Sequence, residues 1–369
     1  MFIRTLHKRS ILTAFLSTAL LATAALMLKF PQALANGVSR GLSVCTSVII
    51  PTLYPFMILA AVLTDSPLGT RHRRCTEAIT TRLFRLPACC ASAILLSLIG
   101  GYPAGSLAIA RLRKSERITA EQAHRMTLFC INAGPGFVVS TVGAGLIGST
   151  RAGWLLFAAH AGTSLLMGIL LARTESARAD APAHAAHTAT ARPFALIVQE
   201  TCTALLTMCG FVLLASAALS IWEACGLPHT LQSLSGIGAA EWSTAAAMLT
   251  EVSCGCIALA GGGRLAPFWL CLCLGWGGLS VQGQLAVLLR EPAKKHTLSG
   301  TFLLARLAHG VISGGVATIL FRFIPIETTT ISTPHSTPFY ASPNVSAALL
   351  LLSFTAMLCF YPKKTGNLE

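Results

Sequence analysis

The stretch ACCASAILLSLIGGYPAGSLAIA occupies residues 88–110 and is apolar, except that glycines and a proline interrupt it at residues 100–105. Basic clusters flank it on both sides, one ending at Arg85 and the other beginning at Arg111. Lysines and arginines collect in the cytoplasmic loops of membrane proteins. A single crossing would leave one of these clusters outside, so we predict a re-entrant hairpin that enters and leaves the membrane on the same face.

The composition of the whole chain agrees with a polytopic membrane protein. Of its 369 residues, 54% are hydrophobic and only 11% are charged, whereas a soluble domain carries about 25% charged residues. The mean hydropathy is +0.68. These values exclude a soluble enzyme, a nucleic-acid-binding protein and a disordered chain. At roughly 20 apolar residues per span, the length allows about eight to ten membrane segments.

The apolar runs predict an all-α fold. Two of them, residues 88–110 and 242–264, are predicted as hairpins. The predicted spans cover residues 11–28, 38–63, 120–147, 154–171, 194–222, 267–289, 298–323 and 345–361. Ala33-Leu34-Ala35 follows the first run and is typical of a signal-peptidase site. Residues 1–37 are therefore either an uncleaved transmembrane anchor, which the length of the run favours, or a signal-like segment.

The net charge of +14 reports topology rather than a nucleic-acid partner. With both termini in the cytoplasm, six predicted inner segments hold 22 of the 27 lysines and arginines. These segments are residues 1–10, 65–86, 111–125, 173–193, 290–306 and 362–369. The basic residues left outside are Lys29, Arg40, Arg151, Arg264 and Arg322. This balance requires both hairpins, the second one opening outward.

The two halves of the chain then match in order. Residues 38–172 and 194–325 each hold a span, a glycine-interrupted hairpin, a span broken at a glycine-rich point and a further span. A cytoplasmic linker, residues 173–193, separates them. The halves enter their hairpins from opposite sides, which predicts an inverted-topology repeat, the plan of many secondary transporters. An outer loop over 326–344 and a C-terminal transmembrane helix with its cytoplasmic tail over 345–369 complete the chain.

Four breaks in helical sequence mark a candidate site. They lie at GGYPAG (100–105), NAGPG (132–136), EVSCG (251–255) and GWGGLSVQ (275–282). Each unsatisfied backbone group at membrane depth costs several kcal/mol, so such breaks persist where they line a cavity or are buried in protein. The alternative is that the glycines only permit close helix packing.

Three motifs carry a resemblance to a known family. The segments GYPAG (101–105), FCINAGPGFVVSTVGAG (129–145) and GGLSVQGQ (277–284), followed by Arg306-x-x-His309, resemble YlbJ-type sporulation integral membrane proteins of the nucleoside-recognition (Gate) domain superfamily. The resemblance covers roughly residues 38–325. It implies two Gate domains and a role in endospore formation, in which dipicolinic acid moves from the mother-cell cytoplasm toward the forespore. It also implies a location in the mother-cell-derived membrane around the forespore.

The long first run, the loop over 326–344 and the 13 cysteines depart from the family pattern, but none of them touches the motifs. The cysteines mostly lie in apolar runs and lack zinc-ligand spacing, so no metal site is predicted.

The candidate substrate-binding residues cluster at the breaks. They are Gly101, Tyr102, Pro103, Gly105, Asn132, Gly134, Gly277, Gly278, Ser280, Gln282 and Arg306. The half-helices expected after Gly105 and Gly134 begin with free N–H groups that can hold an anion. The amides of Asn132 and Gln282 can either hold substrate carboxylates or cap the broken helices.

Three further side chains have two interpretations each. Arg306 either neutralises a dicarboxylate or extends to the lipid headgroups. Tyr102 either stacks on an aromatic ring or packs at the hairpin tip. His160 is expected to be a packed, hydrogen-bonded histidine rather than a proton relay.

Glu251 is the candidate for coupling. It lies in an apolar hairpin, where an ionisable residue is a functional candidate by default. With Ser253, it is expected to bind a coupling cation or to carry a proton. The alternative is a glutamate at the hairpin mouth that reaches water.

These observations favour a secondary transporter or facilitator of a small anion, embedded in a lipid bilayer. No catalytic or phosphate-binding motif is present, so neither an enzyme nor a cofactor is predicted. The alternatives are a Gate-type nucleoside transporter and a non-transporting membrane scaffold of the sporulation machinery. A homo-oligomer is left open.

Overall fold

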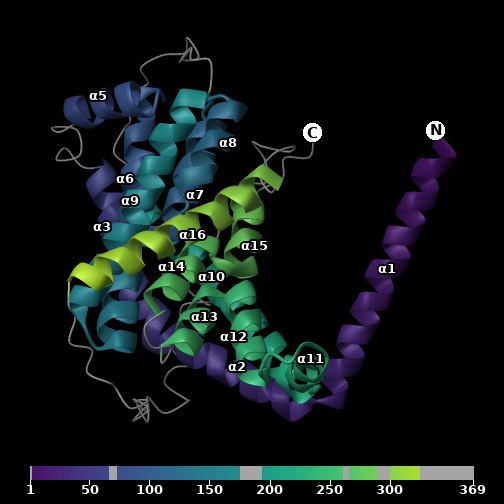
Figure 1. Cartoon of the computed structure of the whole chain (residues 1–369). Coiled ribbons are helices and arrows are strands. Elements are labelled where there is room, and N and C mark those ends of the chain that lie inside the picture. The colour runs from purple at the N-terminus through teal and green to yellow at the C-terminus, as the bar shows by residue number, and fades with distance from the viewer. Residues whose placement is uncertain (1, 66–72, 175–192, 261–265, 290–299, 325–369) are drawn as a thin grey trace.

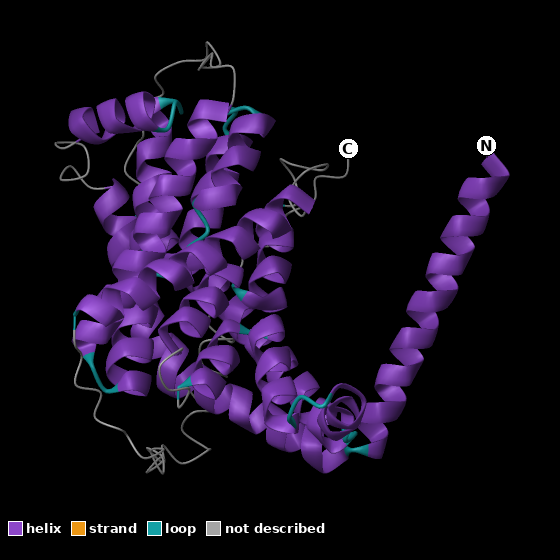
Figure 2. Ribbon diagram, viewed as in Figure 1, coloured by secondary structure: helices purple, strands orange, loops and turns teal. Residues whose placement is uncertain are grey.

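The computed structural model of the chain describes residues 2–65, 73–174, 193–260, 266–289 and 300–324, and every regular element among them is a helix (Figures 1 and 2). The predicted all-α fold is therefore confirmed. Among the described residues, the helices long and apolar enough to cross a membrane are Pro31–Val62, Thr150–Arg173, Phe194–Ala224 and Gly300–Phe323. A fifth crossing results if the bent pair Glu77–Leu83 and Ala88–Ile99 is one span.

The eight to ten segments are predicted for the whole chain, whereas this count covers the described residues, in which several of the apolar runs fold as short or broken helices. The predicted last span, the loop over 326–344 and most of the linker over 173–193 lie outside the described residues.

The first helix, α1 (Phe2–Lys29), leads away from the helical body (Figure 1). Leu20 and Leu28 on this helix are exposed. Helix α2 (Pro31–Val44) begins directly after it, with Pro31 in the first turn, where a missing N–H costs nothing. The signal-peptidase-like tripeptide and the predicted domain boundary at residue 37 both lie within α2.

The prolines of the second span are absorbed without a break. Helix α2 continues through a π-helical turn, η1 (Cys45–Ile49), into α3 (Ile50–Asp65). Pro51 has no N–H to donate to the carbonyl four residues earlier and its ring crowds that carbonyl. The wider turn resolves the conflict, because Ile50 N–H bonds to Cys45 O instead.

The predicted hairpin over residues 88–110 is confirmed. After α5 (Arg73–Leu83) and the short η2 (Ala88–Cys90), α6 (Ala91–Ile99) and α7 (Gly101–Lys114) run antiparallel. The chain reverses at Gly101, whose φ of +79° favours glycine. A Cβ on Gly105 would lie 2.8 Å from Ser97 Cβ on the opposite arm.

Both basic clusters lie at the open end of this first hairpin. The Cys89 thiol, before α6, lies 3.8 Å from the carbonyl oxygen of Arg117, after α7. Arg125 donates to the carbonyl oxygens of Phe84 and Arg85 at 3.1 and 2.7 Å. The arrangement on which the charge argument depends is therefore present in the structure.

The next span is broken as predicted. A capping box between Thr119 and Gln122 starts α8 (Ala120–Phe129). Irregular backbone over residues 130–134 separates α8 from the π-helical η3 (Gly136–Ile147), and α9 (Thr150–Thr174) follows.

The second half follows the same order. Its elements are α10 (Phe194–Ala224), α11 (Leu227–Ser235), α12 (Ala239–Thr250), α13 (Val252–Leu259), α14 (Ala266–Trp276), α15 (Gly278–Leu288) and α16 (Gly300–Phe323). Helices α12 and α13 form the second hairpin, since a Cβ on Gly255 would lie 2.9 Å from Met248 Cα. Helices α14 and α15 form the second broken span, with φ near +78° at Gly277 and +76° at Gly278.

The two halves are interleaved rather than separate. Helix α16 packs against α14 and also against α9 of the first half, while α10 packs against α2 and α3. Small residues allow the close approach. A Cβ on Gly37 in α2, for example, would lie 2.8 Å from Ala217 Cα in α10. The alternative expectation, glycines that serve helix packing, thus holds alongside the breaks.

Candidate substrate site

In the first half, the hairpin tip packs directly on the helix break. A Cβ on Gly134 would lie 2.8 Å from the carbonyl oxygen of Ile99 and 3.0 Å from the backbone nitrogen of Gly101. Only a residue without a side chain permits such contact between two backbones. Helix α7 begins at Gly101 rather than after Gly105 as expected, so its N-terminal end lies against the break.

The second half repeats this contact. A Cβ on Gly278, at the break between α14 and α15, would lie 2.9 Å from the carbonyl oxygen of Thr250 and 3.0 Å from Glu251 Cα. Both of these residues lie at the tip of the second hairpin. In each half, therefore, a glycine of the broken span packs against the backbone of the hairpin tip.

Tyr102 connects the two pairs. Its hydroxyl donates a 2.5 Å hydrogen bond to the carbonyl oxygen of Leu274 in α14, and its ring approaches Gly277. The side chain is buried. Tyr102 therefore packs at the hairpin tip, the second of its two expected roles. It links the first hairpin tip to the broken span of the second half.

Arg306 caps the first broken helix. Its side chain on α16 is only 2% exposed, which contradicts the expectation that it extends to the headgroups. One guanidinium nitrogen, Nη2, donates to the carbonyl oxygen of Leu128 at 2.8 Å, and Nη1 donates to that of Ile131. These carbonyls at the end of α8 have lost their helical partners, and a cation is favourable at that end of a helix.

Two more side chains complete the cap. Asn132 Nδ2 and Ser164 Oγ both donate to the carbonyl oxygen of Phe129, at 2.9 and 2.6 Å. The amide of Asn132 thus caps a broken helix, one of its two expected roles. Its Oδ1 atom is buried and has no hydrogen-bond partner among the described residues, so this face of the amide can accept from a water or a ligand donor.

A histidine pair supports the same break. His160 Nε2 accepts a hydrogen bond from Ala133 N–H at 3.1 Å, and His309 Nε2 donates to the carbonyl oxygen of His160 at 2.9 Å. The two rings are stacked at a tilt, with centroids 4.4 Å apart. His160 is thus packed and hydrogen-bonded as predicted. The pair therefore connects the break to α9 and α16.

Glu251 lies at the tip of the second hairpin in extended conformation and caps α13, accepting a 2.8 Å hydrogen bond from Cys254 N–H. It is 2% exposed and forms no ion pair with the described residues. The alternative of a water-exposed glutamate is therefore wrong. Because a carboxylate already occupies the N-terminal end of α13, this end does not bind an anion.

Ser280 and Gln282 follow the second break on α15, and Ser253 follows Glu251 on α13. All three are buried. Ser280 Oγ and Gln282 Nε2 have no partner among the described residues. A buried polar atom without a partner costs about 1–3 kcal/mol, so these atoms indicate a place for water or a ligand. Pro103 and Gly105 lie behind the tip along α7, where Gly105 packs on α6.

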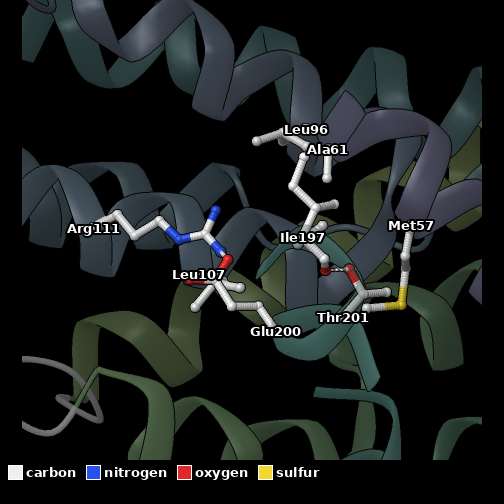
Figure 3. A pocket seen from close by; sticks show the side chains of 9 residues that line it. Met57, Ala61, Leu96, Leu107, Arg111, Ile197, Glu200 and Thr201 are labelled. Atoms are coloured by element: carbon white, nitrogen blue, oxygen red, sulfur yellow. Dashed lines mark hydrogen bonds and ion pairs between the residues drawn. The ribbon is translucent and has the colours of Figure 1, made fainter. Parts of the chain in front are cut away.

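A narrow apolar seam runs beside the first hairpin (Figure 3). It encloses about 20 Å³ and is lined by Met57, Ala61, Leu96, Ala104, Leu107, Arg111, Ile197, Glu200 and Thr201. The Arg111 guanidinium is directed at the Glu200 carboxylate, and the two form an ion pair between α7 and α10. Sequence reasoning missed Glu200, although an acidic residue inside the apolar run over 194–222 was a signal.

The comparisons with known proteins agree with this description. The chain is 25% identical, over 342 residues, to the sporulation integral membrane protein YlbJ of Bacillus subtilis (strain 168), and the match covers 84% of this chain and 83% of that protein. No family model and no solved structure matches the chain. This similarity confirms the resemblance to YlbJ-type integral membrane proteins.

Proposed function

We propose that this protein is a secondary transporter or facilitator that moves a small anion across the membrane, without a cofactor and without catalysis. Dipicolinate is the substrate that the resemblance implies. The observation that carries the proposal is Arg306, a fully buried guanidinium at a helix break whose hydrogen-bond partners are carbonyl oxygens.

The charge of Arg306 is only partly balanced. The end of a helix carries about half an elementary charge, and Arg306 forms no ion pair with the described residues. Its Nε atom is buried and has no hydrogen-bond partner in the part of the chain that the structure describes. An anion at the break would complete the balance, and the N-terminal end of α7 adds a second positive pole there.

The same observation distinguishes the proposal from a nucleoside transporter. An uncharged nucleoside would leave the Arg306 charge unbalanced, whereas a carboxylate would pair with it. Dipicolinate would place one carboxylate toward Arg306 and accept a hydrogen bond from Gln282 Nε2, while a bound water would donate to Asn132 Oδ1 and to a carboxylate.

Glu251 is the proposed coupling group. It is buried at the tip of the second hairpin. An isolated ionised carboxylate at membrane depth is costly. A proton or a cation that enters with the substrate would relieve this cost, which is how coupled transporters use such residues.

Transport requires motion, because the candidate residues are buried in this conformation. We propose that the two halves are an inverted repeat that provides alternating access, with both termini cytoplasmic. The protein would act during sporulation, in the mother-cell-derived membrane around the forespore. In this arrangement the Arg111–Glu200 pair lies at the cytoplasmic end of the seam beside the first hairpin.

Flux into proteoliposomes tests the proposal. Purified protein should carry radiolabelled dipicolinate into vesicles faster than empty vesicles do, and excess unlabelled dipicolinate should compete while uridine should not. Flux of uridine alone would replace the proposal with the nucleoside alternative. Absence of flux for any small anion would favour the scaffold.

A further inference from the structure

A basic pocket lies at the open end of the first hairpin, away from the candidate substrate site. It encloses about 370 Å³ and is lined by Arg82, Leu83, Arg85, Ile169 and Arg173. The residues come from the end of α5, the turn that follows it and the last turn of α9. Helix α5 lies across one end of the helical body (Figure 1).

The position of Arg85 is fixed by the fold. Its φ of +47° lies in the left-handed region, which a residue with a side chain adopts only when its surroundings impose it. The buried Arg125 imposes it, because its Nη2 donates to the carbonyl oxygens of Phe84 and Arg85 at 3.1 and 2.7 Å. The hydrogen bonds of Arg125 thus hold the turn that places Arg85 in the wall of the pocket.

The pocket gathers positive charge that the described residues do not balance. Arg82, Arg85 and Arg173 form no ion pair with the described residues. Three like charges around one cavity repel one another, and a multivalent anion between them would remove this repulsion. Guanidinium groups bind phosphate oxygens in a bidentate manner, so phosphate chemistry fits them well.

The surroundings of the pocket favour a lipid over a free anion. Leu83, in its wall, is 47% exposed. Leu166 and Leu170 are exposed on α9 and share one helix face with Arg173. An apolar stripe therefore leads from the arginines along a span, at the depth where acyl chains lie.

We propose that this pocket binds the phosphate headgroup of an anionic phospholipid, with an acyl chain along the α9 stripe. Basic pockets between transmembrane helices bind such headgroups in other membrane proteins. A bound lipid would join α5 and the first hairpin to α9.

Native mass spectrometry of the detergent-purified protein tests the proposal, with phosphatidylglycerol and phosphatidylcholine as probes. We expect phosphatidylglycerol to bind at least tenfold more tightly than phosphatidylcholine. The double variant Arg82→Gln/Arg173→Gln should lose this preference, whereas Arg82→Lys/Arg173→Lys should keep most of it. Lys114→Gln, an exposed basic residue at the end of α7, is the matched control and should bind as the wild type does.

Two results would overturn the proposal. One is an unchanged preference for phosphatidylglycerol in the glutamine variant that remains folded, as judged by an unaltered thermal transition. The other is displacement of phosphatidylglycerol by inorganic phosphate at equal concentration, which would show a site for a free anion with no contribution from the acyl chain.

Discussion

Replacement of Gly134 by alanine tests whether the first hairpin tip packs on the helix break. The new Cβ would lie 2.8 Å from the Ile99 carbonyl oxygen and 3.0 Å from the Gly101 nitrogen. Both neighbours are backbone atoms and cannot rotate away. To restore ordinary contact, the tip and the break must separate by roughly half an ångström.

The magnitude follows from two opposing effects. Overpacking of this kind costs about 1–3 kcal/mol, while alanine restricts the unfolded chain and returns about 0.4–1 kcal/mol. We expect a net loss of about 1–2 kcal/mol in the free energy of unfolding, measured by denaturation in detergent. Displacement of groups at a binding site by about 1 Å can slow a reaction about a hundredfold, so dipicolinate flux should fall at least about tenfold.

Gly162→Ala is the matched control. Gly162 lies in the middle of α9, and a Cβ there would meet no atom within 4 Å. Alanine favours a helix by up to about 1 kcal/mol over glycine, so stability should be unchanged or slightly raised and flux unaffected. If Gly134→Ala behaves as this control does in both assays, the tip does not pack on the break.

Three further substitutions separate structural from functional roles. Arg306→Met leaves two buried carbonyl groups without donors, which costs about 1–3 kcal/mol each. It should therefore lower the free energy of unfolding in the same denaturation assay. A variant as stable as the wild type would refute the role of Arg306 as a helix cap. Glu251→Gln keeps a capping oxygen, so the free energy of unfolding should change by less than about 1 kcal/mol. Flux through this variant should no longer respond to an imposed proton or cation gradient. Retained coupling would exclude Glu251 as the coupling group. Glu200→Gln breaks an ion pair whose side chains are about 30% exposed, so a double-mutant cycle with Arg111 should give at most about 1 kcal/mol; a much larger coupling would indicate a buried interaction instead.

Local sequence was sufficient to predict the hairpins and the breaks. Glycine and proline within the apolar run over 88–110 oppose a continuous helix, and the flanking arginines require both ends on one side. Asparagine, glycine and proline at residues 132–136 predict the break of the next span in the same way. Such signals are encoded in a few adjacent residues, so hairpins and breaks can be predicted from them without knowledge of the tertiary packing.

Contacts between distant segments could not be predicted in this way. Arg306 was counted with the cytoplasmic residues, yet it is buried and bonds to carbonyl groups 175 and 178 residues earlier. Glu200 pairs with Arg111 across 89 residues. The π-helical turn at Cys45–Ile49, which precedes Pro51, is likewise not apparent from the apolar run over 38–63.

Binding of radiolabelled dipicolinate to purified protein tests the central claim most directly. A charge-assisted hydrogen bond contributes about 1.5–3 kcal/mol, so Arg306→Gln should weaken binding by roughly 10- to 100-fold. Arg306→Lys should retain part of the affinity, and Arg151→Gln, at an exposed helix start, should retain all of it. Equal affinity of the wild type and a folded Arg306→Gln variant would contradict an anion site at the first helix break.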